Sequence, residues 1–294
     1  MSVLILGQTG QVARALQQVL PDAIALGRAE ADLEKPQQLR AAIAARRPKV
    51  IINAAAYTAV DAAEDDRARA FAVNADALDV IGTAAREIGA LVVHYSTDYV
   101  FDGAGETPFS EASTPRPLGV YGESKLAGEA ALQVSGADHL ILRVSWVYAA
   151  AGKNFPLTIL RLAREHESLR IVDDQIGTPT AASRIAAATS LLIARIAADR
   201  SLCGLYHFAP SGYVSWHGFA RALISAAIAQ GAMLKVDPTA VTPIPSSAYP
   251  TRAVRPRNSR LDTTKLRSTF HIDLSDWRDD MTDFIAILRK EGHL

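Results

Sequence analysis

Short apolar runs alternate with longer alanine-rich stretches through the first half of the chain. The short runs are rich in β-branched and aliphatic residues, which predicts strands at Val3–Leu6, Ala23–Leu26, Val50–Asn53, Leu91–Ser96 and Leu140–Val144. The longer stretches predict helices at Gln11–Leu20, Gln37–Ala45, Ala68–Val73 with Ala75–Ile88, and Lys125–Val134. Because the strands are apolar throughout, both sheet faces must be covered, so we predict an α/β fold with a doubly wound parallel sheet.

The pattern changes after Trp146, where strand signals weaken. Helices are predicted at Phe155–His166, Ser183–Ala198, Trp216–Ala229 and Asp276–Lys290, separated by loops rich in Pro, Thr and Ser. We therefore predict a sheet domain over residues 1–150, joined by the helix of residues 183–200, and a smaller C-terminal, mainly substrate-binding lobe over 151–294. The long segment Asp237–Arg260, rich in proline and arginine, is expected to be a loop that binds a ligand.

Composition narrows the function. The 294 residues carry 31 basic and 31 acidic groups, so nothing indicates a nucleic-acid partner. A single cysteine, Cys203, excludes an intrachain disulfide and favours the cytoplasm. The apolar run in Met1–Gly7 is too short for a signal peptide, and the apolar segment Ile185–Ala198 contains Arg195, so we expect neither secretion nor a membrane span.

A glycine-containing turn follows the first strand directly and opens the first helix, as Gly7-Gln8-Thr9-Gly10-Gln11-Val12-Ala13. This context is the one that a Rossmann dinucleotide fingerprint requires. Gly7 would permit the tight turn, Gly10 would let the backbone approach a pyrophosphate, and Ala13 stands in place of the usual third glycine. The alternative is a strand-to-helix turn without a ligand.

Two further strand ends bear on the cofactor. The second strand ends in Gly27-Arg28 without a carboxylate, so Arg28 could pair with the 2′-phosphate of NADP or be a solvated loop residue. NADPH is therefore favoured, and NADH stays possible. Asp32-Leu33 could flank the adenine, or Asp32 could cap the next helix. The small residues Ala54, Ala55 and Ala56 after the third strand leave room for a cofactor, although an alanine run can equally serve helix packing.

The strongest chemical signal is the combination of Thr97, Tyr121 and Lys125. Tyr121 and Lys125 lie four residues apart, so a helix places them on one face, where an ammonium can lower the proton affinity of the phenol. Thr97, at the end of the fourth strand, can add a hydrogen bond. A nicotinamide cofactor with such a phenol suits carbonyl reduction; the alternative is a surface Tyr and Lys on an amphipathic helix.

Other residues carry weaker signals. Trp146 could wall a substrate pocket or belong to the core. A cluster of arginines could clamp a diphosphate or be a solvated face, and consists of Arg252, Arg255, Arg257 and Arg260. Three histidines have no spacing typical of a metal site and are interpreted as structural: His94, His207 and His217.

These motifs resemble those of the extended short-chain dehydrogenase/reductases, and within them the dTDP-4-dehydrorhamnose reductases. The likeness covers nearly the whole chain. It is carried by Gly7–Val12, Asn53–Asp61, His94–Phe101, Val120–Glu129, Ser145–Tyr148, Asp174–Thr180, Gly204–His207 and Arg255–Leu261. The resemblance implies hydride transfer from NADPH to the C4 ketone of dTDP-4-dehydro-L-rhamnose, which gives dTDP-L-rhamnose for cell-surface polysaccharide.

The resemblance also implies residue roles. Tyr121 would be the catalytic acid, Lys125 would hold the nicotinamide ribose and tune the phenol, and Thr97 would assist. Asp98 and Trp146 would face the sugar nucleotide, with Arg255 and Arg257 as the candidates for the diphosphate. The implied cofactor contacts are Gly10, Gln11, Val12, Asp32, Leu33, Ala54, Ala55, Ala56 and Tyr95.

Some relatives form a magnesium-bridged dimer through acidic residues, but the corresponding segments here, Ala13–Ala15 and Ala182–Arg184, hold no carboxylate. We therefore expect no magnesium ligand set and no metal-bridged dimer, which leaves a monomer or another homodimer. Two alternative functions stay open. One is a different reductase or epimerase of nucleotide-linked 4-keto sugars, and the other is a non-catalytic, NADP-binding regulatory subunit.

Overall fold

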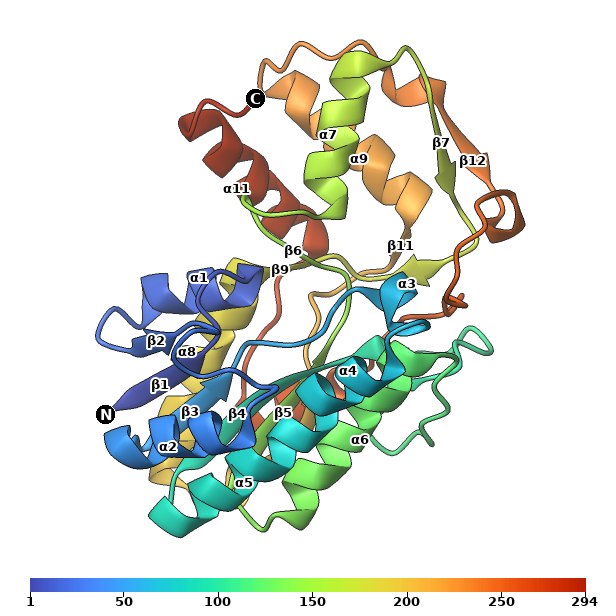
Figure 1. Cartoon of the computed structure of the whole chain (residues 1–294). Coiled ribbons are helices and arrows are strands. Elements are labelled where there is room, and N and C mark those ends of the chain that lie inside the picture. Colours follow the sequence, from blue (N-terminus) through green and yellow to red (C-terminus); the bar gives the residue numbers. More distant parts are fainter.

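A six-stranded parallel sheet forms the centre of the larger lobe in the computed structural model, which describes residues 1–294 (Figure 1). Its strand order is β10-β5-β4-β3-β1-β2. The bounds are β1 Val3–Leu6, β2 Ile24–Leu26, β3 Val50–Asn53, β4 Leu91–Thr97, β5 His139–Val144 and β10 Gly204–His207. The predicted doubly wound, Rossmann-type sheet is confirmed, and β10 is an additional edge strand that the sequence pattern did not predict.

Helices cover both faces of the sheet because successive strand residues point to opposite sides and both sides are buried. Val3 and Ile5 belong to one core with α1 (Gln11–Val19), α8 (Ala182–Ala198) and α10 (Thr264–Phe270). Leu4 and Leu6 belong to the other core, with α2 (Pro36–Arg46), α5 (Ala77–Ile88) and the C-terminal part of α6 (Val120–Val134). The second half of the chain thus supplies one strand and two helices to these layers.

A separate core holds the three long helices in the upper part of Figure 1. These are α7 (Phe155–Glu165), α9 (Trp216–Ala229) and α11 (Trp277–Lys290). Small two-stranded sheets accompany them: β7 (Leu169–Val172) with β12 (Val241–Ile244), β8 (Ile176–Gly177) with β11 (Val214–Ser215), and β6 (Val147–Tyr148) with β9 (Thr180–Ala181). None of the helices combines the length and the apolar character that a membrane-spanning segment needs.

Some predicted bounds need correction. The helix predicted from Lys125 begins at Val120, so Tyr121 lies in its first turn. The predicted pair Ala68–Val73 and Ala75–Ile88 is a continuous run of α4 (Arg67–Phe71), a π-helical turn and α5, with the short α3 (Val60–Ala63) before it. The predicted loop Asp237–Arg260 contains β12, an edge strand whose two-stranded sheet tolerates Pro243.

Candidate active site

The carboxyl ends of the parallel central strands lie along one edge of the sheet. The residues at and just beyond these ends form the candidate site. Register pairs Leu6 with Asn53, Asn53 with His94, and Thr97 with Val144. In an open α/β sheet, ligands bind at this edge. The predicted cofactor and catalytic residues after β1, β3, β4 and β5 therefore lie along one side of the sheet.

The turn after β1 has the shape of a phosphate cradle. Gly7 has φ +107°, and a Cβ there would lie 3.1 Å from the carbonyl carbon of Ala54, so the turn and the alanine run touch. Gly10 caps α1 in an extended conformation with no side-chain hydrogen bond to the first turn, which carries no acidic residue. Helix N-termini of this kind bind phosphate groups through backbone N–H groups. The observed geometry fits a dinucleotide pyrophosphate beside Gly10, Gln11 and Val12.

The segment after β2 is polar and charged. Arg28 Nη2 lies 3.6 Å from Glu34 Oε2, and Arg28 Nε lies 4.0 Å from Asp32 Oδ1, with the arginine side chain 66% exposed. Asp32 Oδ1 accepts a hydrogen bond from the Glu34 backbone N–H, and α2 has Lys35 as its N-cap residue without a side-chain cap. Leu33 is buried in the core. Asp32 thus shapes the turn and does not cap α2, while Arg28 can reach a phosphate from solvent.

Tyr121 and Thr97 come together at the end of β4. Thr97 is buried there with its hydroxyl near the phenol of Tyr121, whose half-buried ring meets the ring of Tyr99 edge-on, with the ring centroids 5.6 Å apart. Burial raises the pKa of Tyr121 above its ordinary value, and the nearby Thr97 hydroxyl opposes this rise. The sequence led us to expect a lowered proton affinity. In the structure burial is the larger effect, so the phenol is protonated at neutral pH.

Lys125 lies one turn further along α6 and is fully enclosed. Its Nζ lies 3.0 Å from His94 Nε2 and donates to the Tyr95 carbonyl at 2.7 Å. Burial lowers the pKa of Lys125 to about 7, although the nearby carboxylate of Glu129 raises it. The Tyr95 side chain lies in the core, with its hydroxyl 2.9 Å from Thr189 Oγ1, so only its backbone faces Lys125.

Asp98 is a buried carboxyl beside the hydroxyl pair. One oxygen accepts from Thr97 Oγ1 at 3.2 Å, while the other is buried and has no hydrogen-bond partner. Burial raises the pKa of Asp98 to about 6, and the neighbouring Ser259 and Thr97 side chains oppose the rise. An unpartnered buried oxygen costs free energy, which a hydroxyl group of a ligand can recover.

Trp146 follows β5 with a left-handed backbone, at φ +47°. Its ring stacks on Trp216 of α9 with centroids 3.5 Å apart, and Gly177 lies against the same ring, where a Cβ would come within 2.6 Å. Trp216 in turn donates from Nε1 to Gln175 Oε1 at 3.2 Å. Trp146 thus links the sheet edge to the second lobe, and sequence reasoning missed Trp216 because no spacing connects the two rings.

The predicted arginines separate into different environments. Arg255 Nη2 donates to Asp61 Oδ2 at 2.8 Å, its Nε is buried without a partner, and its guanidinium lies near the phenol of Tyr99. Arg257 lies 3.9 Å from Asp174 and is 77% exposed. Arg252 pairs with Asp65 on the surface. Only Arg255 adjoins the aromatic pair that contains Tyr121.

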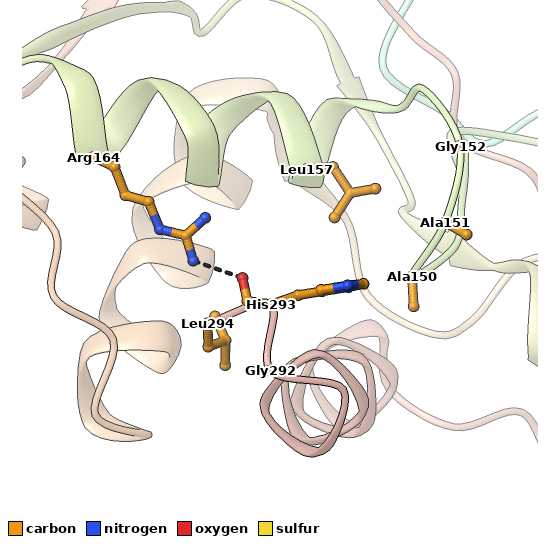
Figure 2. Close-up of a pocket in the computed structure, with 8 residues that line it drawn as sticks. All are labelled: Ala150, Ala151, Gly152, Leu157, Arg164, Gly292, His293 and Leu294. Atoms are coloured by element: carbon orange, nitrogen blue, oxygen red, sulfur yellow. Dashed lines mark hydrogen bonds between the residues drawn. The ribbon is translucent and has the colours of Figure 1, made fainter.

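A cavity of about 740 Å³ lies elsewhere, at the C-terminus (Figure 2). It is lined by Ala150–Gly152, Leu157, Arg164 and the last residues of the chain, and Arg164 donates to the His293 carbonyl at 2.6 Å. None of the predicted catalytic residues lines it. No group of three or more His, Cys, Asp or Glu side chains is arranged to hold a metal ion.

Comparison with known proteins places this geometry in a family. The model of the family described as RmlD substrate binding domain matches residues 1–290. The dTDP-4-dehydrorhamnose reductase of Burkholderia thailandensis is 45% identical over 286 residues, which cover 95% of this chain and 96% of the relative. The chain belongs to the dTDP-4-dehydrorhamnose reductase family.

Two further relatives agree. The dTDP-4-dehydrorhamnose reductase of Escherichia coli K12 is 43% identical over 289 residues, covering 95% of both chains. The crystal structure of the Bacillus anthracis reductase, in complex with NADP, superposes with a TM-score of 0.90 at 33% identity, covering 97% of this chain and 99% of that one. The resemblance inferred from the sequence motifs is therefore confirmed at the level of family and fold.

Proposed function

We propose that this protein reduces the C4 ketone of dTDP-4-dehydro-L-rhamnose to the alcohol of dTDP-L-rhamnose, the final step in making that sugar nucleotide. The observation that carries the proposal is the Thr97–Tyr121 hydroxyl pair, with buried Lys125 one turn away, at the sheet edge that also holds the Gly7–Gly10 cradle. Family membership supports the choice of substrate.

The cofactor we propose is NADPH, with NADH as the alternative. When bound, it supplies the hydride. The Gly7–Gly10 turn and the first turn of α1, with Gln11 and Val12, would hold its pyrophosphate, and Arg28 would pair with the 2′-phosphate. The reductase from Bacillus anthracis with bound NADP supports this assignment. Ala54–Ala56, Asp32 and Lys125 are the further proposed contacts; the Tyr95 side chain, which lies in the core, can contribute only its backbone.

Tyr121 is proposed as the proton donor. The raised pKa keeps the phenol protonated at neutral pH, so a proton is present for the oxygen that becomes an alkoxide as the ketone is reduced. The neighbouring Thr97 hydroxyl assists by orienting the phenol. Lys125, when charged, stabilises the phenolate that this transfer leaves behind.

We propose that Asp98, Trp146 and Arg255 bind the sugar nucleotide. Asp98 offers its unpartnered oxygen to a sugar hydroxyl, and the Trp146 ring offers an apolar wall. Arg255 can exchange Asp61 for the diphosphate, to which a guanidinium binds with two parallel hydrogen bonds. Arg257, which points to Asp174, is the weaker candidate.

The lobes follow from these assignments. We propose that residues 1–150 with the helix of residues 183–200 form the cofactor domain, and that 151–294 mainly bind substrate, a division supported by the packing of α8 beside α1 and by the separate core of α7, α9 and α11. We also propose that the enzyme works in the cytoplasm as a monomer or as a homodimer without a metal bridge.

The proposal is tested by following NADPH absorbance with dTDP-4-dehydro-L-rhamnose generated in situ, and with NADH in parallel. Sugar-dependent oxidation of NADPH, with one NAD(P)⁺ formed per sugar reduced, is the expected result. Conversion of sugar without net oxidation would identify an epimerase. Tight NADPH binding without turnover of any nucleotide sugar would point to a regulatory subunit and overturn the proposal.

A further inference from the structure

Three polar side chains form a buried line beneath the candidate site. They are Asn53 at the end of β3, His94 in β4 and Lys125 in α6, each no more than 2% exposed. Asn53 Nδ2 lies 3.3 Å from His94 Nδ1, and His94 Nε2 lies 3.0 Å from Lys125 Nζ. The imidazole therefore connects an amide to the amine, a contact that the interpretation of His94 as a structural histidine did not include.

The orientation of the Asn53 amide is fixed from the other side. Its Oδ1 accepts a hydrogen bond from the Ala55 backbone N–H at 3.3 Å, so its Nδ2 faces His94 and donates to Nδ1. A neutral imidazole has one donor and one acceptor nitrogen. With Nδ1 accepting, the ring proton of His94 lies on Nε2, directed at Lys125.

An ammonium has donors only, so a charged Lys125 cannot accept this proton. Two arrangements satisfy both ring nitrogens of His94 and the Lys125 nitrogen. In the first, Lys125 is a neutral amine that accepts from His94 Nε2–H and donates to the Tyr95 carbonyl. In the second, Lys125 is charged and donates to Nε2, the ring proton lies on Nδ1, and Asn53 turns its oxygen toward His94. The second arrangement costs the Asn53–Ala55 hydrogen bond, and the two differ by one proton taken from solvent.

The surrounding charged groups leave the link between the His94 tautomer and the charge of Lys125 in place. Glu129, one turn beyond Lys125 on α6, favours the ammonium, but its carboxylate is already bound by both Arg143 of β5 and Ser96 of β4. Tyr121 on α6 stays neutral because burial raises its pKa. Burial and Lys125 lower the pKa of His94 well below its ordinary value, so the ring itself does not become an imidazolium.

We propose that His94 is a positioning residue that, held by Asn53, sets the charge of Lys125 by moving its ring proton between Nε2 and Nδ1. The catalytic consequence rests on the proposed reductase function, whereas the coupling itself can be observed without it. Because Lys125 stabilises the phenolate of Tyr121 only when charged, the tautomer of His94 then controls the pH range in which the proton donor works.

The direct test follows the tautomer of His94 by long-range ¹H–¹⁵N NMR correlation. The sample is the full-length, ligand-free protein labelled with ¹⁵N-histidine. The His94 signals are assigned by their loss in His94→Gln. As pH falls through about 7, where Lys125 titrates, the His94 pattern is expected to change from Nε2–H to Nδ1–H. In Lys125→Met the pattern should stay Nε2–H at every pH.

His207 is the internal control, because its Nδ1 lies 3.0 Å from the Phe109 carbonyl and should stay protonated throughout. A single His94 tautomer across this range in the wild type, or an imidazolium pattern, would overturn the proposal.

The functional arm uses His94→Gln with the sugar nucleotide. A glutamine oxygen accepts from the ammonium at any pH and cannot shift a proton, so the pKa of Lys125 should rise. The alkaline limb of the kcat profile should then move up by about one pH unit or more. His166→Gln, on the surface, is the matched control. If the alkaline limb of the kcat profile does not move in His94→Gln, His94 does not set the charge of Lys125. Failure of the wild type to turn over the sugar would refute the proposed function alone, since the NMR measurement needs no substrate.

Discussion

Two kinds of ion pair occur near the candidate site. One is buried beneath the edge of the sheet, and the other is exposed in the arginine-rich segment of residues 251–260. Arg143 meets Glu129 through Nε and Nη2, at 2.9 and 2.6 Å, and both side chains are almost completely buried. Arg257, in contrast, lies 3.9 Å from Asp174 and is exposed. One pair is enclosed and bidentate, and the other is open to water.

This difference separates two tasks. A buried pair has little solvent to replace a lost partner, so it fixes the electrostatics around Lys125 and tolerates little change. An exposed pair contributes about 0–1 kcal/mol, so its arginine can leave a carboxylate for a ligand phosphate at little cost. Arg255 is intermediate, with an ion pair to Asp61 and a buried Nε that has no partner. We expect the enclosed region to govern the chemistry and the open region to govern substrate affinity.

The largest expected effect is on stability. Glu129→Gln leaves the guanidinium of Arg143 buried without its counter-charge, and should lower the free energy of unfolding by about 3–5 kcal/mol. Urea denaturation at neutral pH measures this change. Glu123→Gln, which breaks an exposed pair with Arg67, is the control and should cost less than about 1 kcal/mol. Equal losses in the two variants would show that enclosure does not distinguish the pairs.

The next effect is catalytic. Tyr121→Phe removes the phenolic hydroxyl and with it the transferable proton, so kcat should fall by about 10²-fold or more while the Kd for NADPH stays nearly unchanged. Tyr206→Phe, whose hydroxyl donates to the Leu202 carbonyl in another part of the molecule, is the control and should keep its activity. Wild-type turnover by Tyr121→Phe would eliminate the assigned proton donor.

The sequence predicted the first five strands closely because each is a short apolar run, bounded by turn residues, whose burial depends on its own pattern. It did not predict β10, because Gly204–His207 is short and lies far along the chain from β5, its only neighbour in the sheet. Hydrophobic periodicity carries no information about which distant segment completes a sheet edge.

The site shows the same limit. Thr97, Tyr121 and Lys125 could be proposed from motifs, since their spacing and strand context are local. The contact between His94 and Lys125 depends on how α6 packs against β4, and the stacking of Trp146 on Trp216 depends on how the second lobe meets the sheet. Such contacts follow from packing, which no residue spacing encodes.

The buried carboxyl of Asp98 predicts how the stability of the enclosed region depends on pH. Its pKa in the folded protein is about 6 and its ordinary value is 3.8, so the folded state binds more protons between these values and loses stability as pH rises through them. Asp98→Asn removes this dependence and should be more stable than the wild type at pH 7 by about 1–3 kcal/mol, with little difference below pH 4. Urea denaturation at both pH values measures it, with surface Asp22→Asn as the control. If Asp98→Asn is less stable than the wild type at pH 7 and equal to it below pH 4, the raised pKa assigned to Asp98 is wrong.

The smallest effect concerns the open region and decides between two arginines. Arg255→Ala should raise the KM for the sugar nucleotide about tenfold, the equivalent of one charge-assisted hydrogen bond, because Arg255 adjoins Tyr99 and thereby Tyr121. Arg257→Ala should change it by less than about threefold, since its side chain points to Asp174 and solvent. In both variants kcat should stay within about threefold of the wild type, because neither group touches the reacting atoms. Steady-state kinetics at saturating NADPH measures these values. The reverse order would mean that the 251–260 segment rearranges when substrate binds, so that exposure in the free protein does not identify the arginine that binds the diphosphate.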